Sequence, residues 1–289
     1  PGRPNVVAST NAPPALRQVV HTPQQPAGGQ AVRITARVTD PDGVSSVTLS
    51  YQVVDPGAYI ELTDDAYATD WTVVPMNDAG TGGDAVAGDG VFAVELPPAI
   101  QVHRRLVRYR ITAVDGRGAA VQVPYADDPQ PNFAYFVYNG VPAWSGAVRP
   151  GAAGTAGAVV TVSAEEMNRL PVIQLLGKKS TVEQSTWFSR YGGDAYPWLG
   201  TLVYDGQVYD HIRHRARGGV WRYAMTKNMW KFDLNRGHDF QARDNWGRPF
   251  RTGWTKLNLG ASIQQGDFNH RGEQGLFESL GLRFFQLAG

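Results

Sequence analysis

The sequence contains no cysteine and almost no net charge. The absence of cysteine excludes disulfide bonds and thiolate metal sites, which suits either a reducing cytoplasm or an exported bacterial protein. With 27 basic and 26 acidic residues the net charge is only +1, so the composition gives no support to the binding of nucleic acid or of a membrane surface. No apolar run reaches the roughly 18 residues that a membrane-spanning helix needs, and no signal peptide is visible.

The chain is long enough for two folded domains. Its 289 residues are 42% hydrophobic and 18% charged, which is typical of globular proteins. Residues 1–29 are rich in Pro, Asn, Gln and Ala and predict an extended lead-in. Small residues within 141–162 predict a linker. We therefore expect a first domain at 30–140 and a second at 163–289.

Residues 30–140 have the pattern of an antiparallel β-sandwich. Stretches such as AVRITARVTD, DGVFAVELP and RLVRYRITAVD alternate apolar and polar side chains, and Pro, Gly and Asp separate them. Asp40-Pro41-Asp42-Gly43 predicts a turn, because proline fixes one backbone angle and glycine accepts the positive one. About six or seven such strands are typical of an immunoglobulin or fibronectin-like sandwich.

One loop of the sandwich, residues 77–90, is rich in oxygen ligands. It reads NDAGTGGDAVAGDG and offers Asn77, Asp78, Asp84 and Asp89 between glycines. Hard cations such as calcium favour carboxylate and carbonyl oxygens on a flexible loop, although the spacing lacks the bidentate Glu of an EF-hand. Turn composition alone also explains these residues, with the carboxylates capping backbone amides. The sequence favours the turn and leaves calcium binding open.

The second domain concentrates cations in two strand-like stretches, HIRHRARGG (211–219) and KNMWKFDLN (227–235). Alternation places the cations of each stretch on one strand face: Arg213, Arg215, Arg217, Lys227 and Lys231. A hairpin of the two strands would gather these charges, which repel unless a carboxylate or polyanion neutralises them, and a phosphate chain meets that need. Alternatively, the lysines extend from a sheet edge into water and discourage edge pairing.

The histidines of this region do not suggest a metal site. His211 and His214 are three residues apart in a strand-like stretch, which places them on opposite faces and poorly for a shared zinc ion. A structural or solvent-facing role is expected for both.

Two helices are expected in the second domain. Ser163 followed by Glu166 predicts the N-terminus of a short helix, because the pair forms a capping box. Near the C-terminus, apolar residues recur at helical spacing behind Glu273, which places Glu273 on the buried stripe. An inward glutamate on a helix, after strands with an inward lysine, is the arrangement that protein kinases use to hold a lysine against nucleotide phosphates.

Three stretches of the second domain resemble the CotH kinase family, which are atypical protein kinases related to a spore coat protein. They are YDGQVYDHIRHRARGG, KNMWKFDLNRGHDF and WTKLNLGASIQQGDFNHRGEQGLFESLGLRFFQLAG. The sandwich, with GDAVAGDGVF and NFAYFVYNGVPAW, also looks like the domain that precedes the CotH region in large exported bacterial proteins. The resemblance implies that Lys227 or Lys231 contacts the α/β-phosphates of ATP. It implies further that Glu273 orients that lysine and that Arg215 or Arg217 adds phosphate contacts.

The same resemblance implies a location and an activity. It implies an exported or cell-surface bacterial protein whose complete kinase domain uses ATP and magnesium to phosphorylate protein hydroxyls. The family places its catalytic and metal-binding aspartates after a segment that follows these motifs, so we expect no catalytic or metal-binding residue here and an inactive fragment. The nearby acids Asp233, Asp239, Asp244 and Asp267 read equally well as turn or solvated residues.

The expected fold is mainly β: an immunoglobulin or fibronectin-like sandwich followed by part of an α+β, kinase-like N-terminal lobe. The alternative function is a noncatalytic adhesion or matrix-binding module at the cell surface, in which the second domain is a scaffold. Carbohydrate binding by the tryptophans around Trp187, Trp198 and Trp246 is a third hypothesis, supported by composition alone. The protein substrate stays open.

Overall fold

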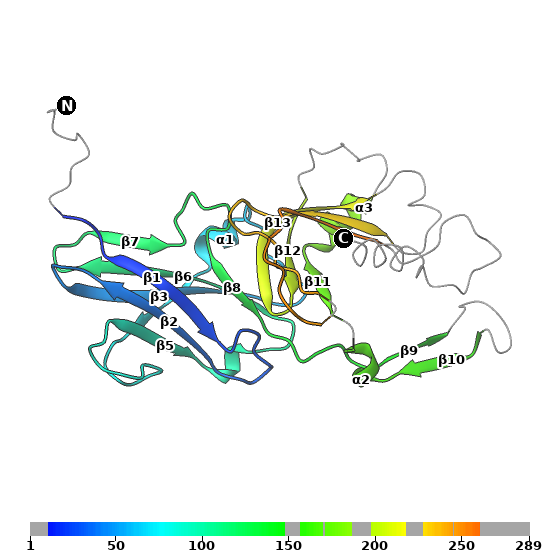
Figure 1. The fold of residues 1–289 in the computed structure, drawn as a ribbon, viewed down its shortest axis with the longest axis horizontal. Coiled ribbons are helices and arrows are strands. Elements are labelled where there is room, and N and C mark those ends of the chain that lie inside the picture. The colour runs from blue at the N-terminus through cyan, green and yellow to red at the C-terminus, as the bar shows by residue number, and fades with distance from the viewer. Residues whose placement is uncertain are drawn as a thin grey trace, which may run out of the picture. The chain divides into compact units, whose positions relative to one another are not determined.

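The computed structural model describes residues 11–147, 157–169, 171–186, 198–217, 228–244 and 246–260. Most of its elements are strands (Figure 1), which confirms the prediction of a mainly β fold. The chain forms two compact units: Pro1–Leu176 with Leu202–Asp210, and Gly177–Thr201 with His211–Gly289. No helix in the described part of the chain has the length and apolar character needed to cross a membrane.

The first unit contains two antiparallel sheets that pack face to face (Figure 1). One has the order β1-β2-β5, with bounds Ala15–Thr22, Val32–Thr39 and Val91–Leu96. The other has the order β4-β3-β6-β7, with bounds Thr72–Met76, Val44–Val54, Leu106–Asp115 and Ala120–Val123. A further strand, β8 (Phe133–Phe136), pairs with β6.

Period-two alternation builds the core between these sheets. Every second residue of β2 is at most 2% exposed: Val32, Ile34, Ala36 and Val38. From the facing sheet, β6 adds the buried residues Tyr109, Ile111 and Ala113. Successive side chains of a strand point to opposite faces, so the alternation seen in the sequence becomes one apolar face per sheet.

Two strands of the sandwich were not predicted. β1 lies within residues 1–29, which the sequence predicted as an extended lead-in, and it pairs with β2 through an irregular register between Arg17 and Val20. An irregular register breaks the period of two and hides the strand from a pattern search. β4 contains Pro75 and lies at the edge of its sheet, where the missing backbone N–H costs least.

The helices of the described residues are short. They are α1 (Asp65–Thr69), the 3-10 helix η1 (Pro98–Ile100), α2 (Ala164–Met167) and α3 (Lys179–Thr186). The cap predicted at Ser163 is confirmed, because its Oγ accepts the backbone N–H of Glu166 at 3.2 Å. The turn predicted at 40–43 is also confirmed: Gly43 has a φ of +81° and donates its N–H to Asp40 O at 3.2 Å.

The strands that follow the sandwich in the chain, β9 to β15, form two further sheets. β9 (Trp144–Ala147) and β10 (Val159–Val162) form an antiparallel pair. A five-stranded sheet has the order β11-β12-β13-β14-β15, with bounds Ile173–Leu176, Leu199–Tyr204, Gln207–Arg217, Met229–Asp233 and Lys256–Leu259. The part of β12 and β13 that belongs to the first unit, Leu202–Asp210, places Val203 and Val208 in an apolar cluster with Leu106.

Candidate functional site

The candidate site is one face of β13, β14 and β15 in the second unit. β13 and β14 pair antiparallel, as the sequence pattern predicted, and Arg215 lies directly opposite Lys231. On the other side of β14, Asn258 of β15 lies opposite Lys231. Directly opposite residues of neighbouring antiparallel strands point to the same face. Arg215, Lys231 and Asn258 therefore form one row across three strands, the Lys231 row.

A second row runs beside the first and contains an acid. Asp233 lies opposite Arg213 on β13 and opposite Lys256 on β15. Its side chain is 8% exposed, and within the described residues its Oδ1 has no hydrogen-bond partner. Among the described residues of β13, β14 and β15 that lie on this face, one carboxylate thus stands among several cations.

The cations of this face differ in their exposure. Arg213 and Arg217 are exposed and Lys231 is half-buried, whereas Arg215 is only 5% exposed. The sequence predicted a face that displays its cations, and Arg215 departs from that expectation. Burial matters for the chemistry, since a charge that water screens poorly acts more strongly on a bound anion.

The opposite face of the same strands is apolar and holds a histidine. His214 lies opposite Phe232, and both are buried. The His214 ring is 6.0 Å from the Trp230 ring, and its Nε2–H donates to Leu199 O at 3.2 Å. Burial lowers the pKa of His214 to about 4. His214 is therefore a neutral packing residue at ordinary pH.

Several candidate residues fall outside the described part of the chain. Lys227 and Glu273, which the resemblance assigns to phosphate contact and lysine orientation, lie there, as do Asp267 and Trp187. Arg215, Arg217 and Lys231 are placed, and the sheet brings Arg215 and Lys231 together.

The loop at 77–90 contains a cluster of three carboxylates. Ligand atoms of Asp78, Asp84 and Asp89 lie within 4.8 Å of one another. Asp78 is also bonded to the backbone: its Oδ1 accepts the N–H of Gly88 at 2.8 Å and of Asp89 at 3.2 Å, and its Oδ2 accepts the N–H of Gly90 at 3.0 Å. These bonds are the amide capping that the sequence favoured.

Replacing Asp78 by alanine is expected to lower the free energy of unfolding of the first unit by about 1–3 kcal/mol, because three backbone amides lose their acceptor. Urea unfolding measures the change, and Asp127→Ala, at an exposed acid elsewhere in the sandwich, should cost under about 0.5 kcal/mol. A capping role also predicts that calcium leaves the melting temperature of the wild type unchanged. A rise in that temperature which disappears in Asp78→Ala would contradict it.

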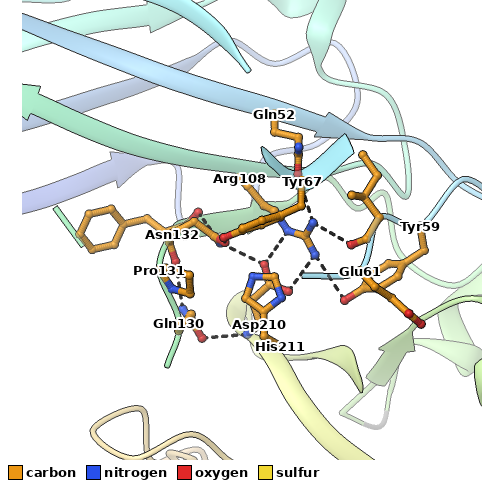
Figure 2. Close-up of polar contacts among 12 residues, drawn as sticks. Gln52, Tyr59, Glu61, Tyr67, Arg108, Gln130, Pro131, Asn132, Asp210 and His211 are labelled. Carbon is orange, nitrogen blue, oxygen red and sulfur yellow. Dashed lines mark hydrogen bonds and ion pairs between the residues drawn. The ribbon is translucent and has the colours of Figure 1, made fainter. Parts of the chain in front are cut away.

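The first unit also holds a buried ion pair between Arg108 of β6 and Asp210 of β13 (Figure 2), and both side chains are 0% exposed. Arg108 donates from Nε to Asp210 Oδ2 at 2.7 Å and from Nη2 to Oδ1 at 3.1 Å. Its Nη1 donates to Gln52 Oε1 at 3.2 Å and to Ile60 O at 2.9 Å. The guanidinium is therefore held by a carboxylate and by neutral acceptors together.

A shell of polar side chains completes the Asp210 end of this network (Figure 2). Asn132 Nδ2 donates to Asp210 Oδ2 at 3.0 Å, and the Tyr67 hydroxyl donates to Asn132 Oδ1 at 2.6 Å. Gln130 Oε1 accepts the backbone N–H of Asp210 at 2.8 Å. Because the charges neutralise each other within the fold, the network is structural.

The pair was not predicted from the sequence, where the only signal was Arg108, one of two arginines within the largely apolar run LVRYRITAV. A charge at such a position must find a compensating partner when the strand is buried. The pattern does not say where the partner lies, and Asp210 is 102 residues away along the chain.

No protein-family model matches the chain, and none of the curated proteins is significantly similar to it. A functional proposal therefore rests on the residues, on their geometry and on the motif resemblance.

Proposed function

We propose that the face of β13–β15 binds the phosphates of a nucleotide, as part of the N-terminal lobe of a CotH-like atypical protein kinase. In this proposal ATP is the phosphate donor and hydroxyls of a protein are the acceptors. Lys231 and Arg215 contact the phosphate oxygens, with Arg217 at the end of the same strand face. By resemblance, Lys227 and Glu273 join them, and the protein is exported or attached to the bacterial cell surface.

The observation that carries the proposal is the pairing of Arg215 with Lys231. Directly opposite side chains lie on the same face of the sheet, so one phosphate chain can contact both the guanidinium and the ammonium. The guanidinium presents a planar fork of donors that fits phosphate oxygens, while the ammonium of Lys231 acts as a compact point charge. The two types of cation are complementary in phosphate recognition.

The donor set also fits a metal-loaded nucleotide. Magnesium bound with the nucleotide would neutralise part of the phosphate charge. Arg215 and Lys231 then need to compensate only the remaining charge. The row itself would orient the phosphate chain across the strands.

Replacing Lys231 by alanine is expected to weaken the binding of Mg·ATP about tenfold or more, because a charge-assisted hydrogen bond is worth about 1.5–3 kcal/mol. Isothermal titration calorimetry on the wild type and on Lys231→Ala measures the change, with Lys227→Ala in parallel. Arg215 is buried, so Arg215→Lys, which keeps a positive charge, replaces the alanine variant at that position. A thermal melt of each variant confirms that it is folded.

The matched control is Lys179→Ala. Lys179 is an exposed lysine on α3 that pairs only loosely with Glu183 at 3.7 Å, and its loss should leave the affinity unchanged. Equal affinity of the wild type, Lys231→Ala and Lys227→Ala for Mg·ATP would overturn the assignment of the lysines. Absence of nucleotide binding in the folded wild type would overturn the proposed function.

A further inference from the structure

Exposed aromatic side chains gather in one stretch of the second unit, residues 240–244 and 246–254, which we call the aromatic hairpin. Trp246 is 62% exposed, Phe250 38% and Trp254 39%. Within the described residues of this unit, they are the only large hydrophobic side chains with such exposure. A concentration of exposed apolar surface of this kind commonly marks an interaction site.

The backbone of the hairpin is well bonded, so the exposure does not come from a loose loop. Phe240 and Trp254 exchange two backbone hydrogen bonds, at 2.8 and 3.0 Å. At the tip, Asp244 Oδ1 accepts the N–H of Trp246 at 2.8 Å and of Arg248 at 2.9 Å. These bonds lower the pKa of Asp244 and keep its carboxylate charged, although its desolvation acts in the opposite direction. The hairpin therefore presents its aromatic rings from a fixed frame.

The hairpin is also positive in a chain whose net charge is only +1. Residues 240–254 contain one acid, Asp244, and its carboxylate is already bonded to the tip and to Arg248 Nε at 3.2 Å. The cations of the stretch are all exposed: Arg243, Arg248 and Arg251. The Arg248 guanidinium lies 5.2 Å from the centroid of the Trp246 ring. Cationic and aromatic surface are thus contiguous at the tip.

We propose that the aromatic hairpin docks an acidic peptide segment of a partner protein. Tryptophan and arginine are the residue types that most often dominate the binding energy of protein interfaces, and here they are neighbours. The exposed cations would attract carboxylates of the partner and set the orientation of the encounter, while Trp246 and Phe250 would bury its apolar side chains. This docking goes beyond nucleotide binding and does not depend on it.

The ring geometry favours a peptide over a sugar. Phe250 and Trp254 pack at 80° with their centroids 5.3 Å apart, so they do not form a coplanar platform on which sugar rings stack. Side chains of a peptide that alternate acidic and apolar groups can reach both the ring edges and the separate guanidinium groups. The number of exposed arginines further selects an acidic segment over a neutral one.

The test uses a short, fluorescently labelled, capped peptide in which Glu alternates with Leu, and a matched peptide with Gln in place of Glu. Fluorescence anisotropy with the full chain is expected to show binding of the Glu peptide that weakens as salt is added. Trp246→Ala should weaken this binding about tenfold or more, as for an interface hot spot, and Arg251→Gln should weaken it by a smaller factor. The Gln peptide should bind at least about tenfold more weakly than the Glu peptide.

Two variants act as controls. Trp144→Ala removes another exposed tryptophan, 47% exposed on β9, and Arg33→Gln removes an exposed arginine of β2. Neither should change the affinity. Failure of the Glu peptide to bind, equal binding of both peptides, or no effect of Trp246→Ala overturns the proposal. Binding to phosphatidylglycerol vesicles or to an acidic polysaccharide in place of the Glu peptide, lost in Trp246→Ala, also overturns it and assigns the hairpin to that ligand.

Discussion

Replacing Asp210 by alanine is expected to lower the free energy of unfolding of the first unit by about 3–5 kcal/mol, the cost of breaking a buried ion pair. The change removes the acceptor of two Arg108 hydrogen bonds, at 2.7 and 3.1 Å, and leaves the guanidinium buried without its counter-charge. It also removes the acceptor of the Asn132 amide. Urea unfolding followed by circular dichroism measures the loss.

The balance of forces at Arg108 explains the size of this effect. Burial alone lowers the pKa of Arg108, but the attraction and hydrogen bonds of Asp210, together with the nearby Tyr59 and Tyr67, outweigh it and the net pKa is raised. Asp210 supplies the carboxylate among these compensating groups. The rings of Tyr59 and Tyr67, each 5.4 Å from the guanidinium, supply too little compensation to replace a carboxylate.

An exposed pair in the same unit provides the control. Arg105 donates to Asp55 Oδ1 at 2.6 Å, but the Asp55 side chain is 54% exposed, so Asp55→Ala should cost under about 1 kcal/mol. The double variant Arg108→Met with Asp210→Leu should cost less than Asp210→Ala, because it leaves no unpaired buried charge. A loss in Asp210→Ala no larger than that in Asp55→Ala would show that the buried pair contributes little.

Acidification from about pH 6.5 to about pH 4 is expected to remove about 3 kcal/mol of stability from the second unit through His214 alone. Burial lowers the pKa of His214 to about 4, whereas an unfolded histidine titrates near its ordinary value of 6.5. Between these values the unfolded state binds the proton and the folded state does not, so stability falls as the pH falls. Below the folded pKa the contribution levels off.

Urea unfolding at pH values between about 7 and about 4 measures this dependence. Carboxylates titrate in part of the same range, so the informative quantity is the difference between the wild type and His214→Phe, which keeps an aromatic ring without the titrating group. Trp230→Phe changes the neighbouring ring, 6.0 Å away, and should retain the wild-type slope. Equal slopes in the wild type and His214→Phe would contradict the assignment.

The sandwich was predictable because its strands obey a local rule. Along β2, and along β6 from Tyr109 onward, buried side chains alternate with more exposed ones, and the period of two is legible in the sequence. β1 escaped prediction because its register is irregular between Arg17 and Val20. The rule fails where a strand departs from regular pairing.

The candidate site was predictable only in part. Alternation placed Arg215 and Lys231 each on a strand face, and pairing of β13 with β14 brought them opposite each other. The burial of Arg215 was not predictable, because exposure depends on what covers a strand and not on its own period. The aromatic hairpin was recognised only as tryptophan-rich composition, since its tip depends on the bonds of Asp244.

The sequence by itself determined the strand periods, the turn at 40–43, the cap at Ser163 and the cation-bearing faces, because each depends on residues a few positions apart. Tertiary structure alone decided which charges meet. Arg108 finds Asp210 across 102 residues, and Asp233 lies between Arg213 and Lys256. Electrostatic and burial energies depend on distances in space, and folding sets those distances between residues that the sequence keeps far apart.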